Sequence, residues 1–114
     1  MIKKVSNKQR KINNKLKEVY QSILDERPHY CSGCGRSDVR LSFSHIIPRS
    51  RRKDLETNPD NITLHCLSSP APERIGCHNL WEGTKEQKEK LLDYHQLMSY
   101  ILETDSEYYF LLID

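Results

Sequence analysis

The apolar positions in the N-terminal part of the chain follow a helical period. They recur at steps of four, three and four residues, at Ile12, Leu16, Val19 and Ile23. Residues at this spacing line one face of a helix. The pattern predicts a helix over residues 7–26, within a basic N-terminal region 7–28 that closes at Pro28, because proline disfavours a helical residue before it.

A period of two replaces the helical period in the middle of the chain. Apolar Val39, Leu41 and Phe43 alternate with polar residues, which predicts a strand over 38–47 that Pro48 interrupts. A second short apolar run predicts another strand over residues 61–65. The segment 49–60 between them is polar, closes with the letters NPDN, and is expected to be a loop.

The C-terminal part returns to helical spacing. The proline-containing segment 67–76 reads as a loop, and "CHNLWE" at 77–82 as the start of a short helix. Residues 84–103 predict one continuous helix, which Thr84 caps. The last segment begins with Thr-x-x-Glu, a capping-box pattern that favours a final short helix, with a terminal strand as the alternative.

Length and composition indicate one small domain, residues 1–114, with a lean core. Only 36% of the residues are hydrophobic and 30% are charged, so a metal or disulfides would add needed stability. The sequence contains no apolar run of about 18 residues, which argues against a membrane span. The N-terminus lacks the apolar segment of a signal peptide, which predicts a cytoplasmic protein.

The net charge of +2 conceals two halves of opposite sign. Residues 1–53 carry 14 Lys and Arg against 4 Asp and Glu, whereas residues 54–114 carry 4 against 12. A basic half of this density suits a polyanion such as nucleic acid. The lysines of the first helix, among them Lys11 and Lys15, are candidates for phosphate contacts, although a solubilising face is an equal interpretation.

Four cysteines provide a candidate metal site. Cys31 and Cys34 form a Cys-x-x-Cys turn, and Cys66 and Cys77 form a second, more widely spaced pair. Four thiolates suit a structural zinc ion, and in a cytoplasmic protein persistent disulfides are not expected. Two alternatives remain at this point: four unrelated thiols, or a zinc pair with two buried cysteines. The neighbouring histidines 29 and 65 are possible substitute ligands.

Four segments together resemble the HNH endonucleases: "CSGCG", "SHIIPRS", "NPDNITLHC" and "GCHNLWE". The resemblance covers about residues 29–82 and is closest in character to small phage-encoded members, which act in the host cell. It implies an α+β protein whose ββα-metal core (also called a His-Me finger) carries a four-cysteine zinc site. N- and C-terminal helices, 7–28 and 83–114, would flank that zinc-stapled core, and DNA would be the partner.

The resemblance also implies roles for individual residues. His45 matches the histidine that acts as general base, and Asn61 matches the central asparagine that holds the loop between the strands. His78 matches a metal ligand at the start of the helix, and Glu82, one turn later, would share its face. Ser44 stands where the family usually has a metal-binding Asp, His or Glu, so it is a weaker ligand candidate.

Hydrolysis of a phosphodiester fits this residue set. His45 can accept a proton near neutral pH, and a divalent ion such as Mg²⁺, Mn²⁺ or Ni²⁺ would stabilise the leaving oxygen. Basic residues follow His45 within eight positions and are candidates for phosphate contacts: Arg49, Arg51, Arg52 and Lys53.

Two other functions remain open at this stage. One is a catalytically weak, zinc-stabilised DNA-binding module, which Ser44 favours. The other is a zinc-stabilised adaptor whose acidic C-terminal half docks a partner protein. In the nuclease interpretation a partner protein is a possible source of targeting.

Overall fold

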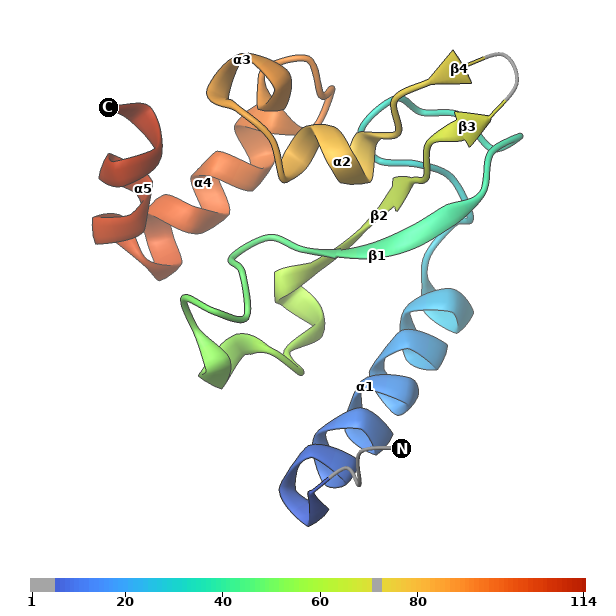
Figure 1. Cartoon of the computed structure of the whole chain (residues 1–114), viewed down its shortest axis with the longest axis vertical. Helices are drawn as coiled ribbons and strands as arrows, with labels where there is room; N and C mark the ends of the chain where they lie inside the picture. Colours follow the sequence, from blue (N-terminus) through green and yellow to red (C-terminus); the bar gives the residue numbers. More distant parts are fainter. Residues whose placement is uncertain (1–5, 71–72) are drawn as a thin grey trace, which may run out of the picture.

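The computed structural model describes residues 6–70 and 73–114 (Figure 1). Its centre is an antiparallel hairpin of β1 (Leu41–His45) and β2 (Ile62–Cys66). The register pairs Phe43 with Leu64 and Ser44 with Thr63. A small hairpin of β3 (Ser69–Pro70) and β4 (Glu73–Arg74) follows.

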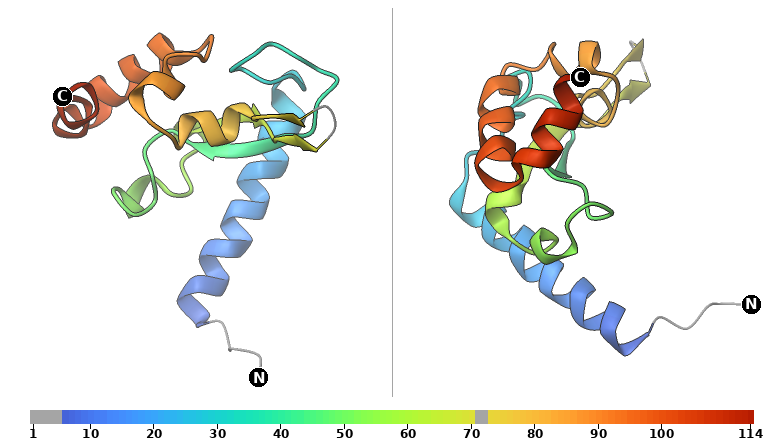
Figure 2. Two further views of the ribbon diagram at one scale, coloured as in Figure 1. Left: turned by 45° about the horizontal axis from the view of Figure 1, so that its top comes forward. Right: turned by 90° about the vertical axis from the view of Figure 1, so that its left-hand side faces the viewer.

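Helix α1 (Asn7–Glu26) packs its apolar face on this hairpin. Its buried residues Val19 and Ile23 contact Ile62 and Leu64, and the ring of Tyr20 stacks on Phe43 with centroids 4.0 Å apart. The guanidinium of the next residue, Arg27, donates to the carbonyl oxygens of Ile62 and Pro59. These contacts fix the C-terminal end of α1, while its basic N-terminal end projects away from the core (Figure 2).

The alternation of β1 separates two faces of the hairpin. Leu41 and Phe43 pack with α1, whereas Ser42 and Ser44 point to the opposite side, toward α2 (Cys77–Trp81). The views in Figures 1 and 2 place α1 and α2 on opposite sides of the strands. The predicted strand 38–47 is therefore correct in its alternation but shorter, because it ends at the Pro48 turn and starts after the exposed Arg40.

The continuous helix predicted over 84–103 is wrong. The segment forms α3 (Lys85–Lys88) and α4 (Tyr94–Thr104), separated by a bend. The amide of Leu92 donates to the carbonyl of Gly33, 2.8 Å away, instead of making a helical hydrogen bond. This tertiary contact overrides the local helical preference, although Thr84 does cap α3 in a capping box with Gln87.

The last segment is a helix, α5 (Ser106–Ile113), and not a strand. Its capping residue is one position later than the Thr-x-x-Glu pattern indicated, because α4 continues through Thr104. The Asp105 carboxylate accepts from the amide of Tyr108 instead. Loop 49–60 contains two short 3-10 helices, η1 (Lys53–Leu55) and η2 (Pro59–Asn61), and part of the 67–76 loop forms β3 and β4.

Within the described part of the chain, every helix is too short or too polar to cross a bilayer. The fold is thus of the α+β type, with helices around a small two-stranded antiparallel sheet, and is consistent with a ββα-metal core.

Candidate functional site: a cysteine cluster beside a histidine pocket

The four cysteines converge at one end of the β1–β2 hairpin. The sulfur atoms of Cys31, Cys34, Cys66 and Cys77 all lie within 4.8 Å of one another, and those of Cys34 and Cys66 are 3.8 Å apart. Sulfurs placed tetrahedrally at about 2.3 Å from zinc would be about 3.8 Å apart. The cluster therefore has the donor set and spacing of a structural zinc site with four protein ligands.

Two glycines allow this convergence. A Cβ on Gly76 would lie 2.4 Å from the backbone carbon of Leu67, so only glycine lets the chain cross the end of β2 and deliver Cys77. A Cβ on Gly33 would lie 2.8 Å from the Cβ of Cys77. The loop between Cys66 and Cys77 therefore returns to the end of β2 through close backbone contact at Gly76.

The chemistry of the cluster also fits a cation. Backbone amides point at two of the sulfurs: Cys66 N at Cys31 Sγ, 3.2 Å, and Cys77 N at Cys66 Sγ, 3.3 Å. Burial raises the pKa of the Cys31 and Cys77 thiols, and neighbouring sulfurs raise that of Cys77 further. A bound zinc ion reverses this preference, because a coordinating thiol is deprotonated.

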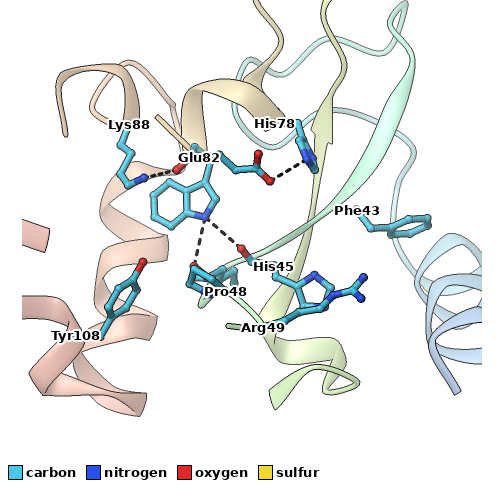
Figure 3. Close-up of a pocket in the computed structure, with 10 residues that line it drawn as sticks. Phe43, His45, Pro48, Arg49, His78, Glu82, Lys88 and Tyr108 are labelled. Carbon is cyan, nitrogen blue, oxygen red and sulfur yellow. Dashed lines mark hydrogen bonds and ion pairs between the residues drawn. The ribbon is translucent and has the colours of Figure 1, made fainter. Parts of the chain in front are cut away.

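A pocket of about 420 Å³ lies at the other end of the hairpin (Figure 3). Its lining comes from three parts of the chain: β1 with the turn after it, α2 with its C-terminal end, and the later helices. The residues that matter for chemistry are His45, Arg49, His78, Glu82 and Lys88. The structure thus brings together His45 and His78, which are 33 positions apart in the sequence.

His45 is the last residue of β1 and is half-buried in this pocket. Its Nε2 donates to the carbonyl oxygen of Glu56, 2.8 Å away. A neutral imidazole carries one proton, so Nδ1 is left as the acceptor. Burial lowers the pKa of His45, which favours the neutral form that can accept a proton.

Asn61 is fully buried and does not line the pocket. Its side-chain oxygen accepts from the amide of Ile47, and its amide nitrogen donates to the carbonyl of Ile47 and, at 3.4 Å, to that of Leu55. These bonds clamp both ends of the loop between β1 and β2. Asn61 therefore shapes the segment that presents His45 and Arg49.

His78 and Glu82 form the opposite side of the pocket. His78 Nε2 lies 3.1 Å from Glu82 Oε1, with the two residues one helical turn apart as their spacing predicts (Figure 3). His78 Nδ1 lies 2.9 Å from the hydroxyls of both Ser42 and Ser44. An imidazole nitrogen and a carboxylate are suitable donors for a divalent ion.

Ser44 lies beneath His78. It is 2% exposed, is not among the pocket-lining residues, and its hydroxyl contacts His78 Nδ1 and His65 Nδ1. His65 is fully buried and its other nitrogen faces Asp93. Both side chains therefore support the pocket from inside, and His65 belongs neither to the cysteine cluster nor to the pocket lining.

The basic residues after His45 divide into two groups. Arg49 is exposed and lines the pocket, and Lys53 is exposed at the start of η1. Arg51 and Arg52 instead pair with Asp105 at the α4–α5 junction, and Arg52 also pairs with Asp54. The latter two arginines hold the loop against the C-terminal helices.

Lys11 and Lys15 are exposed on the projecting part of α1. They lie among other exposed basic residues of that helix: Lys8, Arg10 and Lys17. This end of α1 therefore presents a basic surface outside the pocket.

Two residues of the pocket had no sequence signal for their roles. The Lys88 ammonium donates to the carbonyls of Trp81 and Gly83, and thereby caps the C-terminal end of α2. The Trp81 indole is buried in the core and donates to the carbonyls of His45 and Ile46. A lysine seven positions after a tryptophan carries no local pattern that reveals such contacts.

Comparison with known proteins supports the assignment suggested by these residues. Residues 31–68 match the family model described as HNH endonuclease, and this match includes His45, Asn61 and three of the four cysteines. Cys77 and His78 lie beyond it. No curated protein and no solved structure gives a significant match. Over residues 31–68, about one third of its length, the chain is therefore similar to the HNH endonucleases.

Proposed function

We propose that the chain acts as a single-domain, metal-dependent endonuclease that hydrolyses phosphodiester bonds of DNA. His45 would be the general base, His78 and Glu82 would hold the divalent ion, and Asn61 would maintain the loop. The match of residues 31–68 to the HNH endonuclease family supports nuclease chemistry and DNA as the substrate.

The observation that carries the proposal is the hydrogen bonding and burial of His45. Its Nε2 donates to a backbone carbonyl, so Nδ1 is the one acceptor of this ring, which lines the same pocket as His78 and Glu82. A general base must be neutral, oriented, and near the metal-bound phosphate. Burial favours neutrality, and the Glu56 carbonyl fixes the ring.

The remaining requirement is charge stabilisation. A divalent ion supplies it by polarising the phosphate and stabilising the leaving oxygen. His78 and Glu82 provide two donors on the wall that α2 contributes to the pocket. Two protein donors leave room for phosphate oxygens and water, as is usual for Mg²⁺ and Mn²⁺ sites.

Substrate binding would use exposed cations. Arg49 lies in the pocket, where it can contact the phosphate next to the cleaved bond, and Lys53 lies on the same loop. Lys11 and Lys15 would contact phosphates farther along the duplex. Contacts of this kind depend strongly on salt concentration and carry little sequence information.

The test is plasmid cleavage by the zinc-loaded protein beside His45→Ala, with Mg²⁺, Mn²⁺, Ni²⁺ or EDTA. Wild type is expected to nick or linearise DNA with at least one metal. His45→Ala is expected to be about 10²- to 10⁴-fold slower, the usual contribution of a general base. His95→Ala is the matched control, because His95 is an exposed histidine of α4 outside the pocket.

Three results would contradict the proposal. Equal cleavage by wild type and His45→Ala would indicate a contaminant or a different base. Equal loss in His95→Ala would indicate a nonspecific effect of losing a histidine. DNA binding in a shift assay without cleavage by any metal would identify a zinc-stabilised DNA-binding module instead.

A further inference from the structure

A chain of polar groups runs beneath His78 into the core. Asp93 Oδ2 lies 3.1 Å from His65 Nε2, and His65 Nδ1 lies 3.0 Å from the Ser44 hydroxyl. The same hydroxyl lies 2.9 Å from His78 Nδ1. All three supporting side chains are buried, so this series is shielded from water.

The positions of the protons along this series follow from Asp93, the residue at its buried end. The Asp93 carboxylate accepts, so a His65 ring with a single proton carries it on Nε2. His65 Nδ1 is then an acceptor, and the only hydrogen of the Ser44 hydroxyl is directed to it. Ser44 consequently receives the hydrogen bond from its second partner, His78 Nδ1.

Ser42 leads independently to the same assignment. Its hydroxyl donates to the carbonyl oxygen of His65, 3.0 Å away, and thereby uses its one hydrogen. Its contact of 2.9 Å with His78 Nδ1 must therefore also be a hydrogen bond that it accepts. Two hydroxyls thus place a proton on Nδ1 of His78, and a ring with a single proton carries it there.

The outer nitrogen of His78 then has no proton. It faces Glu82 Oε1 at 3.1 Å, so an imidazole lone pair points at a carboxylate oxygen. Two acceptors at this distance repel each other unless a second ring proton or a metal cation lies between them. The arrangement is what a ligand pair for a divalent ion requires.

Burial of Asp93 carries a cost in stability. Its Oδ1 is buried without a hydrogen-bond partner in the described structure, and an unpaired buried acceptor costs about 1–3 kcal/mol. The α3–α4 bend, at which Leu92 contacts Gly33, places this carboxylate against His65.

We propose that Asp93, His65 and Ser44 are positioning residues that hold His78 as its Nδ1–H tautomer, with a bare Nε2 presented to the divalent ion beside Glu82. Ser44 then has a defined role, although it is not itself a ligand. Its hydroxyl donates to His65, which Asp93 orients, and accepts from Nδ1 of His78. The inference rests on the proposed function only in that His78 is a metal ligand.

The first test is the tautomer of His78 in the zinc-loaded wild-type protein at pH 8, without added divalent ion. Long-range ¹H–¹⁵N NMR correlations distinguish the two ring nitrogens. The expected result is a protonated Nδ1 and an unprotonated Nε2. A proton on Nε2 of His78 would overturn the proposal, and this readout needs no variant that might fail to fold.

The second test is calorimetric titration of Mn²⁺ into wild type and Ser44→Ala. Loss of an outer-shell partner typically weakens metal binding about 10- to 100-fold, and that range is expected here. Thr63→Val is the matched control, because Thr63 is buried directly across the strand pair from Ser44 but lies outside the series.

The outcomes separate this proposal from the nuclease function. Mn²⁺ affinity within about twofold of wild type in Ser44→Ala would overturn the positioning role, and so would equal weakening in Thr63→Val. The expected tautomer and affinities without any DNA cleavage would support the positioning role and contradict the nuclease proposal. Neither measurement uses the cleavage reaction.

Discussion

The two faces of the β1–β2 hairpin are built in opposite ways. The face toward α1 is apolar and is held by Ile23, Ile62 and Leu64 with the stacked rings of Tyr20 and Phe43. The face toward α2 is polar, and hydroxyl and imidazole groups of β1, β2 and α2 join across it at 2.9–3.0 Å.

The two faces of the ten strand residues are therefore expected to have different roles, one in stability and the other in binding. Apolar packing is non-directional and tolerates shape-conserving changes at modest cost. Hydrogen bonds between buried polar groups are directional and fix which nitrogen carries a proton. The α1 face should therefore govern how stable the hairpin is, and the α2 face what the pocket can bind.

The largest expected effect is that of removing the metal, because the cysteine cluster joins α2 to the end of β2 and to the turn at Cys31 and Cys34. Structural zinc contributes about 10–16 kcal/mol in small metal-dependent peptides, comparable to the whole stability of a domain. Chelation should therefore unfold the chain cooperatively, as followed by circular dichroism, and added Zn²⁺ should restore it. A protein that contains no zinc and whose melting temperature ignores chelators would contradict the zinc assignment.

The next effect comes from a cavity on the apolar face. Ile23 is 2% exposed between α1 and the strands. Ile23→Ala should lower the free energy of unfolding by about 2–5 kcal/mol, measured by urea denaturation. The rate of DNA cleavage at low temperature should stay close to that of wild type, because the pocket residues are on other elements.

Asn14→Ala is the control for that change, since Asn14 is exposed on the same helix and its loss should alter stability by less than about 0.5 kcal/mol. Ser44→Ala should weaken metal binding and lower stability less than Ile23→Ala does, because it removes one hydrogen-bond partner of the buried His65 and no apolar packing. If Ile23→Ala abolished cleavage while the protein stayed folded, the two faces would not be separable.

A smaller effect distinguishes the arginines after β1. Arg49→Ala should remove about one phosphate contact and lower the salt dependence of DNA binding by about 0.9 in log–log slope. Arg51→Ala should instead lower the melting temperature, because Arg51 pairs with Asp105 and lies over the ring of Tyr108.

Arg36→Ala is the control for the DNA measurement, because Arg36 is exposed and paired with Asp38 outside the pocket. Both variants are compared with wild type by fluorescence anisotropy at several salt concentrations. A larger loss of DNA affinity in Arg51→Ala than in Arg49→Ala would reverse the division of roles.

The smallest expected effect is on the pH dependence of cleavage, whose fall at acidic pH should begin at a lower pH because of His45. Burial lowers the pKa of His45 below about 6.5, the ordinary value of histidine. A base is active when unprotonated, so kcat/KM should fall only as the pH drops below that ordinary value. The profile is measured with Mn²⁺ from pH 5 to 8, and a half-maximum above 6.5 would contradict the assignment.

Much of the local structure follows from the sequence. The helix 7–26 was confirmed as Asn7–Glu26, because its apolar spacing and the proline after it agree with its packing. The cysteine spacing correctly indicated a four-residue cluster. The helix 84–103 was predicted as continuous because no proline or glycine interrupts it, whereas the break arises from the contact of Leu92 with Gly33.

The candidate site divides in the same way. The family resemblance pointed to His45 and His78, and the fold places both in one pocket. It assigned Ser44 to the metal, and the structure instead places this side chain beneath His78. Asp93 had no signal at all, because a single aspartate in a helical pattern resembles a surface charge.

The sequence by itself determined most of the helical and extended segments, the four cysteines that can meet at one metal site, and the two histidines that are candidates for the pocket. These properties depend on residue types and on spacings of a few positions. Only the tertiary structure decided which polar groups leave water and become partners. It buried Ser44, His65 and Asp93 in one series and used Arg51 and Arg52 internally, because such pairings depend on contacts between residues far apart in the chain.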